Sequence, residues 1–223
     1  GRKTKGTGYV VLDGLISKNE TVQAHAVALA LSQYVFTYKT ATKKIKKEST
    51  TFIVYGNFAK EVDRAIVVIN AIYNARDLIH TPSTIKNPAW LATQVKAIAA
   101  TKSDIDVSVL SGRQLSKFGG LQAVGGSSPN PGPRMIQITY APKGSSRWPH
   151  VVLVGKGISF DTGGISLKRP YDIMAPMKSD MSGAAAVLAT LLTVAQLDLT
   201  VNVTALMMCA ENAISKSAQR PSD

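Results

Sequence analysis

The sequence has little cysteine and no long apolar run. Its single cysteine, Cys209, excludes an internal disulfide and fits a reducing compartment. No apolar run approaches the roughly 20 residues that cross a bilayer, and no apolar segment follows the basic start GRKTKGTG. The sequence therefore predicts neither a membrane helix nor a signal peptide, and we expect a cytoplasmic protein.

Acidic side chains are also scarce, since 26 Lys and Arg face 14 Asp and Glu and the formal net charge is +12. Such an excess raises the hypothesis of nucleic-acid binding. The densest basic cluster is Lys43, Lys44, Lys46 and Lys47. No nucleic-acid motif surrounds it, and a lysine run alone supports only weak, salt-sensitive contact with phosphates. We favour a solvated loop and keep nucleic acid as an alternative partner.

The 223 residues are 45% hydrophobic, which suits one large or two small globular domains. Segments with helical spacing, clearest over 59–79, alternate with short apolar runs such as 51–55 and 201–210. Asn87 followed by Pro88 is typical of a helix start. This alternation predicts an α/β fold with a mainly parallel sheet flanked by helices.

One stretch, 151–186, gathers ionisable groups in apolar surroundings. The run Val151–Val154 predicts a strand buried on both faces, and the glycines around Lys156 predict that the chain then leaves the sheet. Lys156, Asp161, Lys168 and Asp180 follow, and charged groups are rarely buried unless they are paired or bind a metal. The spacing alone leaves two interpretations open, which are two structural ion pairs (Lys156 with Asp161, Lys168 with Asp180) or a functional site.

Longer motifs favour the site. VGKGISFDTGGISLK followed by MKSDMSGAAAV closely resembles the most characteristic region of the leucyl aminopeptidase family, the cytosol aminopeptidases. The resemblance continues through ARDLIHTPSTIKNPAWLA upstream and CAENAISKSAQRPSD downstream, so it covers most of the chain from about Ala75 onward. It implies that residues 1–57 are the remainder of a smaller α/β domain, 58–80 a linker helix, and 81–223 the amino-terminal part of an incomplete catalytic domain.

The resemblance also implies a role for each residue. Lys156, Asp161 and Asp180 match metal ligands, with Asp161 shared between two divalent ions, Mn or Zn. Lys168 matches the lysine that stabilises the oxyanion, and Met177 a residue that lines the substrate pocket. The implied reaction is hydrolysis of an amino-terminal peptide bond in peptide substrates, with leucine-like residues preferred. Glu211, which follows a strand end at Ala210, is expected to support the site without binding metal.

The family completes its site with a later segment, NTDAEGR, which carries two more metal ligands and an arginine that holds a bicarbonate. That segment does not occur in this sequence. We therefore expect the chain as given to be catalytically incomplete, and the complete protein to form a homo-hexamer. The alternative is a non-catalytic paralogue or fragment that keeps the fold for assembly or for binding nucleic acid.

Overall fold

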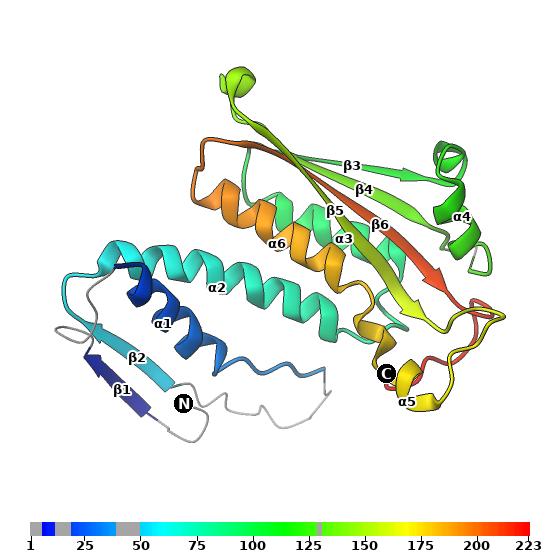
Figure 1. Cartoon of the computed structure of the whole chain (residues 1–223), viewed down its shortest axis with the longest axis horizontal. Coiled ribbons are helices and arrows are strands. Elements are labelled where there is room, and N and C mark those ends of the chain that lie inside the picture. Colours follow the sequence, from blue (N-terminus) through cyan, green and yellow to red (C-terminus); the bar gives the residue numbers. More distant parts are fainter. Residues whose placement is uncertain (1–5, 12–18, 39–49, 129–130) are drawn as a thin grey trace. The chain divides into compact units, whose positions relative to one another are not determined.

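The computed structural model describes residues 6–11, 19–38, 50–128 and 131–223 (Figure 1). The chain divides into two compact units, Gly1–Tyr73 and Asn74–Asp223, and the division falls within helix α2 (Ala59–His80). The domain boundaries expected from the sequence stay predictions. The lysine cluster at 43–47 lies outside the described residues. No helix among those described is long and apolar enough to cross a membrane.

The first unit is a small βαβ element followed by the first part of α2. Strands β1 (Gly6–Val11) and β2 (Thr50–Tyr55) pair in parallel, and α1 (Asn19–Leu31) lies between them in sequence. Val22 and Ala65 are fully buried, so α1 and α2 each contribute to a local core. The strand and helices expected here from apolar spacing are confirmed.

The second unit is built around a four-stranded sheet with the order β3-β4-β6-β5. Its strands are β3 (Ile105–Ser111), β4 (Arg134–Tyr140), β5 (His150–Asp161) and β6 (Asn202–Asn212). Its helices are α3 (Pro88–Ala99), α4 (Gly119–Gly125), α5 (Tyr171–Met174) and α6 (Ser182–Gln196), with the shorter 3-10 turns η1 (Gly112–Leu115), η2 (Ser145–Arg147) and η3 (Ala175–Ser179).

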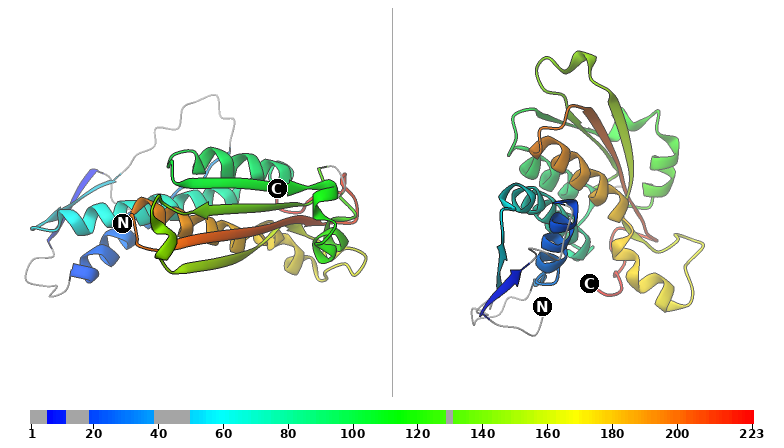
Figure 2. Two further views of the ribbon diagram at one scale, coloured as in Figure 1. Left: turned by 90° about the horizontal axis from the view of Figure 1, so that it is seen from above. Right: turned by 60° about the vertical axis from the view of Figure 1, so that its left-hand side comes forward.

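The core of this unit lies between the sheet and two helices. Figures 1 and 2 show α3 and α6 side by side against one face of the sheet. Leu91 of α3 and Leu188 of α6 are buried together with Ile136 of β4 and Met207 of β6. The predicted start of α3 is confirmed, because the Asn87 side chain accepts a hydrogen bond of 2.9 Å from the backbone N–H of Trp90.

The prediction of a mainly parallel sheet is wrong for this sheet. Strand β5 pairs in parallel with β6, but β3 with β4 and β4 with β6 are antiparallel. Helix α6 crosses back over the sheet and so brings β6 parallel to β5. The link from β3 to β4 contains the four-residue η1 and the seven-residue α4, and the longer of the two, α4, is about 10 Å long. It is too short to return the chain to the far edge, so β4 runs back antiparallel.

The prediction that β5 is buried on both faces is also wrong within the described residues. β5 is the last strand of the sheet, and Val151, Val152 and Val154 are 43%, 55% and 65% exposed. The strand also continues through the glycines around Lys156 instead of ending there. A Cβ on Gly155 would lie 2.6 Å from the carbonyl oxygen of Gly183 in α6, so this glycine serves close helix packing.

Cys209 is a residue of β6, and its thiol is buried. Burial raises the pKa of Cys209 to about 12. A thiol that holds its proton this firmly is a poor nucleophile. Its sulfur would lie 2.7 Å from a Cβ on Gly157, so the thiol fills the space that this glycine leaves.

One fully buried lysine joins two segments of the second unit. Lys86 has no exposed surface, and its Nζ donates to the carbonyl oxygens of Ile79 (2.8 Å) and Lys178 (2.6 Å). Burial lowers the pKa of Lys86 to about 8, with a further contribution from the Lys178 charge. The amine therefore ties the end of α2 to the turn that carries Met177.

Lys86→Met is expected to destabilise the second unit by about 2 kcal/mol at pH 7, because two buried carbonyls lose their donor. The folded-state pKa of about 8 lies below the value of 10.5 for a free lysine. Between these two pH values the unfolded chain binds more protons than the folded chain, so the free energy of unfolding of the wild type rises with pH. The difference in free energy of unfolding between the wild type and Lys86→Met therefore widens as the pH rises. Urea unfolding from pH 7 to pH 10 measures this, and a gap independent of pH would contradict it.

Candidate metal centre

Two strand ends meet at one edge of the sheet. β5 ends at Asp161 and β6 at Asn212, and the parallel register pairs these two residues directly. An irregularity in the pairing falls between Ile158 and Asp161. Because parallel strands bring their carboxyl ends to the same edge, polar residues from separate parts of the chain converge there.

A tight turn then returns the chain to Asp161. Gly163 and Gly164 adopt φ values of 87° and 67°, which favour glycine, and the backbone N–H of Lys168 donates to the Thr162 carbonyl (2.9 Å). The turn places the Lys168 Nζ 3.0 Å from Oδ2 of Asp161. The same amine lies 3.4 Å from the sulfur of Met177 in η3. Lys168, Asp161 and Met177 are thus neighbours, although they come from three different elements.

Asp180, the residue that follows η3, is the fourth member of the cluster. Its Oδ2 lies 2.7 Å from the Nζ of Lys156, which is 3.9 Å from Oδ2 of Asp161. The four residues named from the sequence therefore lie together, but their shortest pairs are Lys156 with Asp180 and Lys168 with Asp161. The sequence spacing alone suggested Lys156 with Asp161 and Lys168 with Asp180, so the closest partners are exchanged. A single four-charge cluster forms instead of two separate ion pairs.

The two oxygens of Asp161 have different surroundings. Oδ1 accepts hydrogen bonds from the backbone N–H of Gly163 (2.9 Å) and from Nδ2 of Asn212 (2.7 Å). Oδ2 faces the amines of Lys168 and Lys156. The first oxygen is held by fixed neutral donors, and the second is directed toward positive charge.

The pKa values of the two carboxyl groups are shifted in opposite directions. Burial acts to raise the pKa of Asp161, but hydrogen bonds from Lys168 and from Gly163 outweigh it, so the pKa lies below its ordinary value. Burial raises the pKa of Asp180, the Lys156 ammonium opposes this rise, and the negative charge of Asp161 adds to it, so the pKa lies above its ordinary value. On acidification Asp180 therefore takes up a proton before Asp161.

The donor set fits a divalent cation. Oδ2 of Asp180 is buried and lacks a hydrogen-bond partner in the part of the chain that the structure describes, although Lys156 is its ion-pair partner. Two carboxylates and an amine can bind a metal once the amine is neutral, which the positive charge of the ion favours. Among the described residues no group of three or more His, Cys, Asp and Glu could hold a metal. Lysine would therefore have to supply a ligand.

The cluster opens into a cavity of about 620 Å³. Lys156, Asp161 and Asn212 line it together with the apolar Phe118 and Met208, whereas Lys168, Asp180 and Met177 do not. A larger cavity of about 940 Å³ lies elsewhere, beside η1 and α4, and contains none of the residues predicted for the site. The charge cluster, and not the largest cavity, therefore marks the candidate site.

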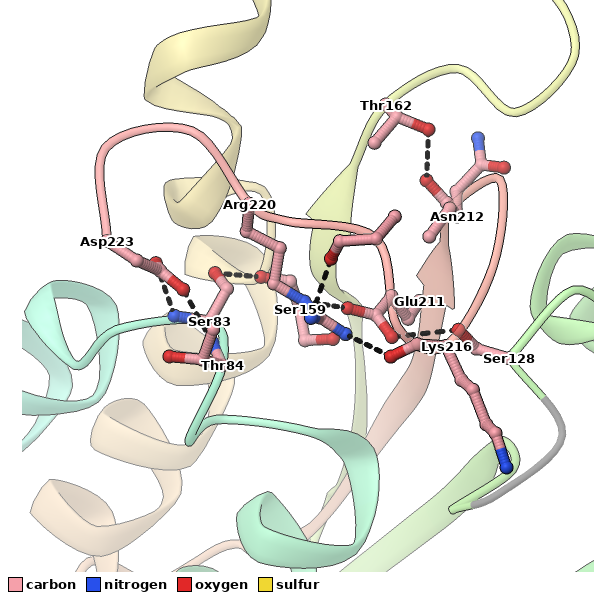
Figure 3. A network of polar contacts seen from close by, with 12 residues as sticks. Ser83, Thr84, Ser128, Ser159, Thr162, Glu211, Asn212, Lys216, Arg220 and Asp223 are labelled. Atoms are coloured by element: carbon pink, nitrogen blue, oxygen red, sulfur yellow. Dashed lines mark hydrogen bonds and ion pairs between the residues drawn. The ribbon is translucent and has the colours of Figure 1, made fainter.

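A second polar network, which the sequence analysis missed, anchors the segment after β6 (Figure 3). Glu211 is 4% exposed and accepts from the Nε of Arg220 at 2.5 Å and from the hydroxyl of Ser128 at 2.9 Å. Further along, the Asp223 carboxylate accepts from the backbone N–H groups of Ser83 (2.7 Å) and Thr84 (2.6 Å). Glu211 is thus engaged in an ion pair with Arg220, and its supporting role at the site stays a prediction.

Comparisons with known proteins place these residues in a family. Residues 73–223 match the cytosol aminopeptidase family, catalytic domain. The chain is 39% identical over 208 residues to a probable cytosol aminopeptidase of Cutibacterium acnes, covering 92% of this chain and 40% of that protein. It is 36% identical over 233 residues to the probable cytosol aminopeptidase of Corynebacterium glutamicum, covering 100% of this chain and 46% of that protein.

Solved structures agree with this similarity. The cytosol aminopeptidase from Coxiella burnetii matches with a TM-score of 0.81 and 29% identity, over 100% of this chain and 46% of that chain. The bottromycin maturation enzyme BotP in complex with Mn matches with a TM-score of 0.75 and 33% identity, over 91% and 42%. The chain spans less than half the length of these relatives. Because the family match covers more than half of this sequence, including the entire charge cluster, the chain belongs to the cytosol aminopeptidase family.

Proposed function

We propose that this chain is part of a two-metal aminopeptidase that releases amino-terminal residues, leucine-like ones preferred, from peptides in the cytoplasm. The observation that carries the proposal is the cluster of two carboxylates and two amines at the sheet edge, in which Asp161 and Asp180 both lie within 4 Å of the Lys156 amine. Family membership supports the same reaction class, and BotP, one similar structure, is described in complex with Mn.

Each side chain then has a distinct role. Lys156 as a neutral amine, Asp161 and Asp180 would hold one divalent ion, Mn or Zn, and Asp161 would also serve a second. Bound ions of this kind polarise a carbonyl and lower the pKa of a bound water. The Lys168 side chain stabilises the negative charge that develops on the substrate carbonyl oxygen. Met177, 3.4 Å from the Lys168 amine, lines the pocket for the first substrate side chain.

The described residues supply more ligands for one ion than for the other. Only Asp161 is available to a second metal, and no further group of three acidic, His or Cys side chains lies within the described ranges. In this proposal the remaining ligands, and a bicarbonate that acts as the base, belong to a complete protein that assembles as a homo-hexamer. The second candidate is a non-catalytic member that keeps the fold for assembly or for binding nucleic acid, and the net charge of +12 is the observation that favours it.

Titration with Mn²⁺ tests the metal site in this chain directly. We expect the 223-residue chain to bind one Mn²⁺ by isothermal calorimetry, and Asp180→Asn to weaken the affinity at least tenfold, because a charged ligand is lost. Asp198→Asn is the matched control, since Asp198 also pairs with a lysine, Lys102 at 2.6 Å, but is 74% exposed. Failure of the wild-type chain to bind Mn²⁺, or equal loss in both variants, would overturn the metal site.

A further inference from the structure

Asn212 carries a role that goes beyond the ligands. We propose that Asn212 is a positioning residue, which holds Oδ1 of Asp161 so that Oδ2 stays directed toward the bound cation. The inference rests on the proposed metal site and deepens it. Its basis is the 2.7 Å hydrogen bond from Nδ2 of Asn212 to Oδ1, on the oxygen opposite the one that faces Lys156 and Lys168.

The chemistry of the contact fixes which way the Asn212 amide points. An ionised carboxylate only accepts hydrogen bonds, so the amide nitrogen and not the amide oxygen must face Asp161. The amide oxygen then points toward Gly164, where even a Cβ would come within 3.1 Å of it. Asn212 therefore offers its donor to the carboxylate and keeps its acceptor turned to the glycine turn.

The backbone of Asn212 is itself held on both sides. Its carbonyl accepts from the backbone N–H of Thr162 (2.8 Å) and from the Thr162 hydroxyl (3.0 Å), as Figure 3 shows for the hydroxyl. The same hydroxyl accepts from the N–H of Gly164 (3.1 Å). The residue before it, Glu211, is buried and paired with Arg220. Because this backbone is constrained, the Nδ2 donor of Asn212 has little freedom to move with the Asp161 carboxylate if the carboxylate rotates.

This arrangement keeps one oxygen of Asp161 available to a cation. A carboxylate that turns freely spends part of its time with neither oxygen directed at the ion. With Oδ1 held by Asn212 and by Gly163, rotation costs two hydrogen bonds, one of which comes from a side chain. Removal of such a partner behind a metal ligand typically lowers metal affinity by about 10- to 100-fold.

The test is Mn²⁺ affinity in Asn212→Ala, measured by calorimetry on the 223-residue chain. We expect a loss of at least tenfold with little change in the unfolding midpoint. Asn202→Ala is the matched control, because Asn202 lies at the other end of β6 and likewise donates its Nδ2 to an acceptor, the Ser145 carbonyl at 2.9 Å. We expect Asn202→Ala to bind Mn²⁺ as the wild type does.

Asn212→Asp keeps the test available if the alanine variant does not fold, since it preserves the size of the side chain. It replaces the donor by a second carboxylate that repels Asp161, so we expect its Mn²⁺ affinity to fall as well. Affinity at or above the wild-type value in either folded variant overturns the positioning role. Failure of the wild-type chain itself to bind Mn²⁺ overturns the metal site as a whole, which separates the two outcomes.

Discussion

In the complete aminopeptidase proposed above, Lys168→Ala is expected to lower the turnover of leucine arylamides about a hundredfold. The amine lies 3.0 Å from Oδ2 of Asp161 and 3.4 Å from the sulfur of Met177, so it sits between the proposed metal ligand and the proposed substrate pocket. Loss of one donor to a developing oxyanion typically costs 10²–10³ in kcat. The measurement is steady-state kinetics with saturating Mn²⁺.

Metal affinity separates this role from a structural one. Lys168 places a positive charge beside Asp161, so its removal is not expected to weaken Mn²⁺ binding. Lys143→Ala, at an exposed position, is the control and should keep wild-type turnover. Wild-type turnover in Lys168→Ala removes the residue from the mechanism, and a loss of Mn²⁺ affinity equal to the loss of turnover assigns it to holding the site.

Arg220→Met is expected to destabilise the second unit by about 3–5 kcal/mol, because it leaves the Glu211 carboxylate buried without its charge partner. The side chains of the pair are 12% and 5% exposed, and Nε lies 2.5 Å from Oε1. Urea unfolding followed by tryptophan fluorescence reports on this unit alone, since Trp90 and Trp148 both fall within it.

The double variant Arg220→Met with Glu211→Gln shows how much of this loss comes from the stranded charge. A neutral amide can keep a hydrogen bond with Ser128, so we expect the double variant to be more stable than Arg220→Met alone. Arg147→Met, at an exposed arginine, should change the free energy of unfolding by less than about 0.5 kcal/mol. A destabilisation of that small size in Arg220→Met would show that the pair contributes little.

Local signals predicted most of the secondary structure. The Asn87–Pro88 start of α3 was recognisable because a cap needs only its own side chain and the next turn of backbone. The apolar spacing of α2 gave its range to within one residue at the carboxyl end, His80 in place of Ile79. The charged residues of the site were also identifiable, since motif resemblance and their apolar surroundings both pointed to them.

Features that depend on tertiary contacts could not be predicted from the sequence. Sheet direction depends on whether a connection spans the sheet, and the spacing of β3 and β4 does not reveal that α4 is too short to do so. Ion-pair partners depend on how a turn folds back, which is why Lys168 meets Asp161 and not Asp180. Arg220 lies in a polar stretch without periodicity, so no local signal indicated that it pairs with Glu211.

The outer edge of β5 has a practical consequence for the isolated chain. Strand β5 is twelve residues long and carries exposed valines. As the last strand of the described sheet, it offers unpaired backbone donors and acceptors along its free side. Such a ribbon is a ready template for a strand from another molecule, and natural proteins usually protect long flat borders of this kind. Self-association at high concentration would therefore begin along Val151–Val154, close to Lys156, one of the groups on which the titrations depend.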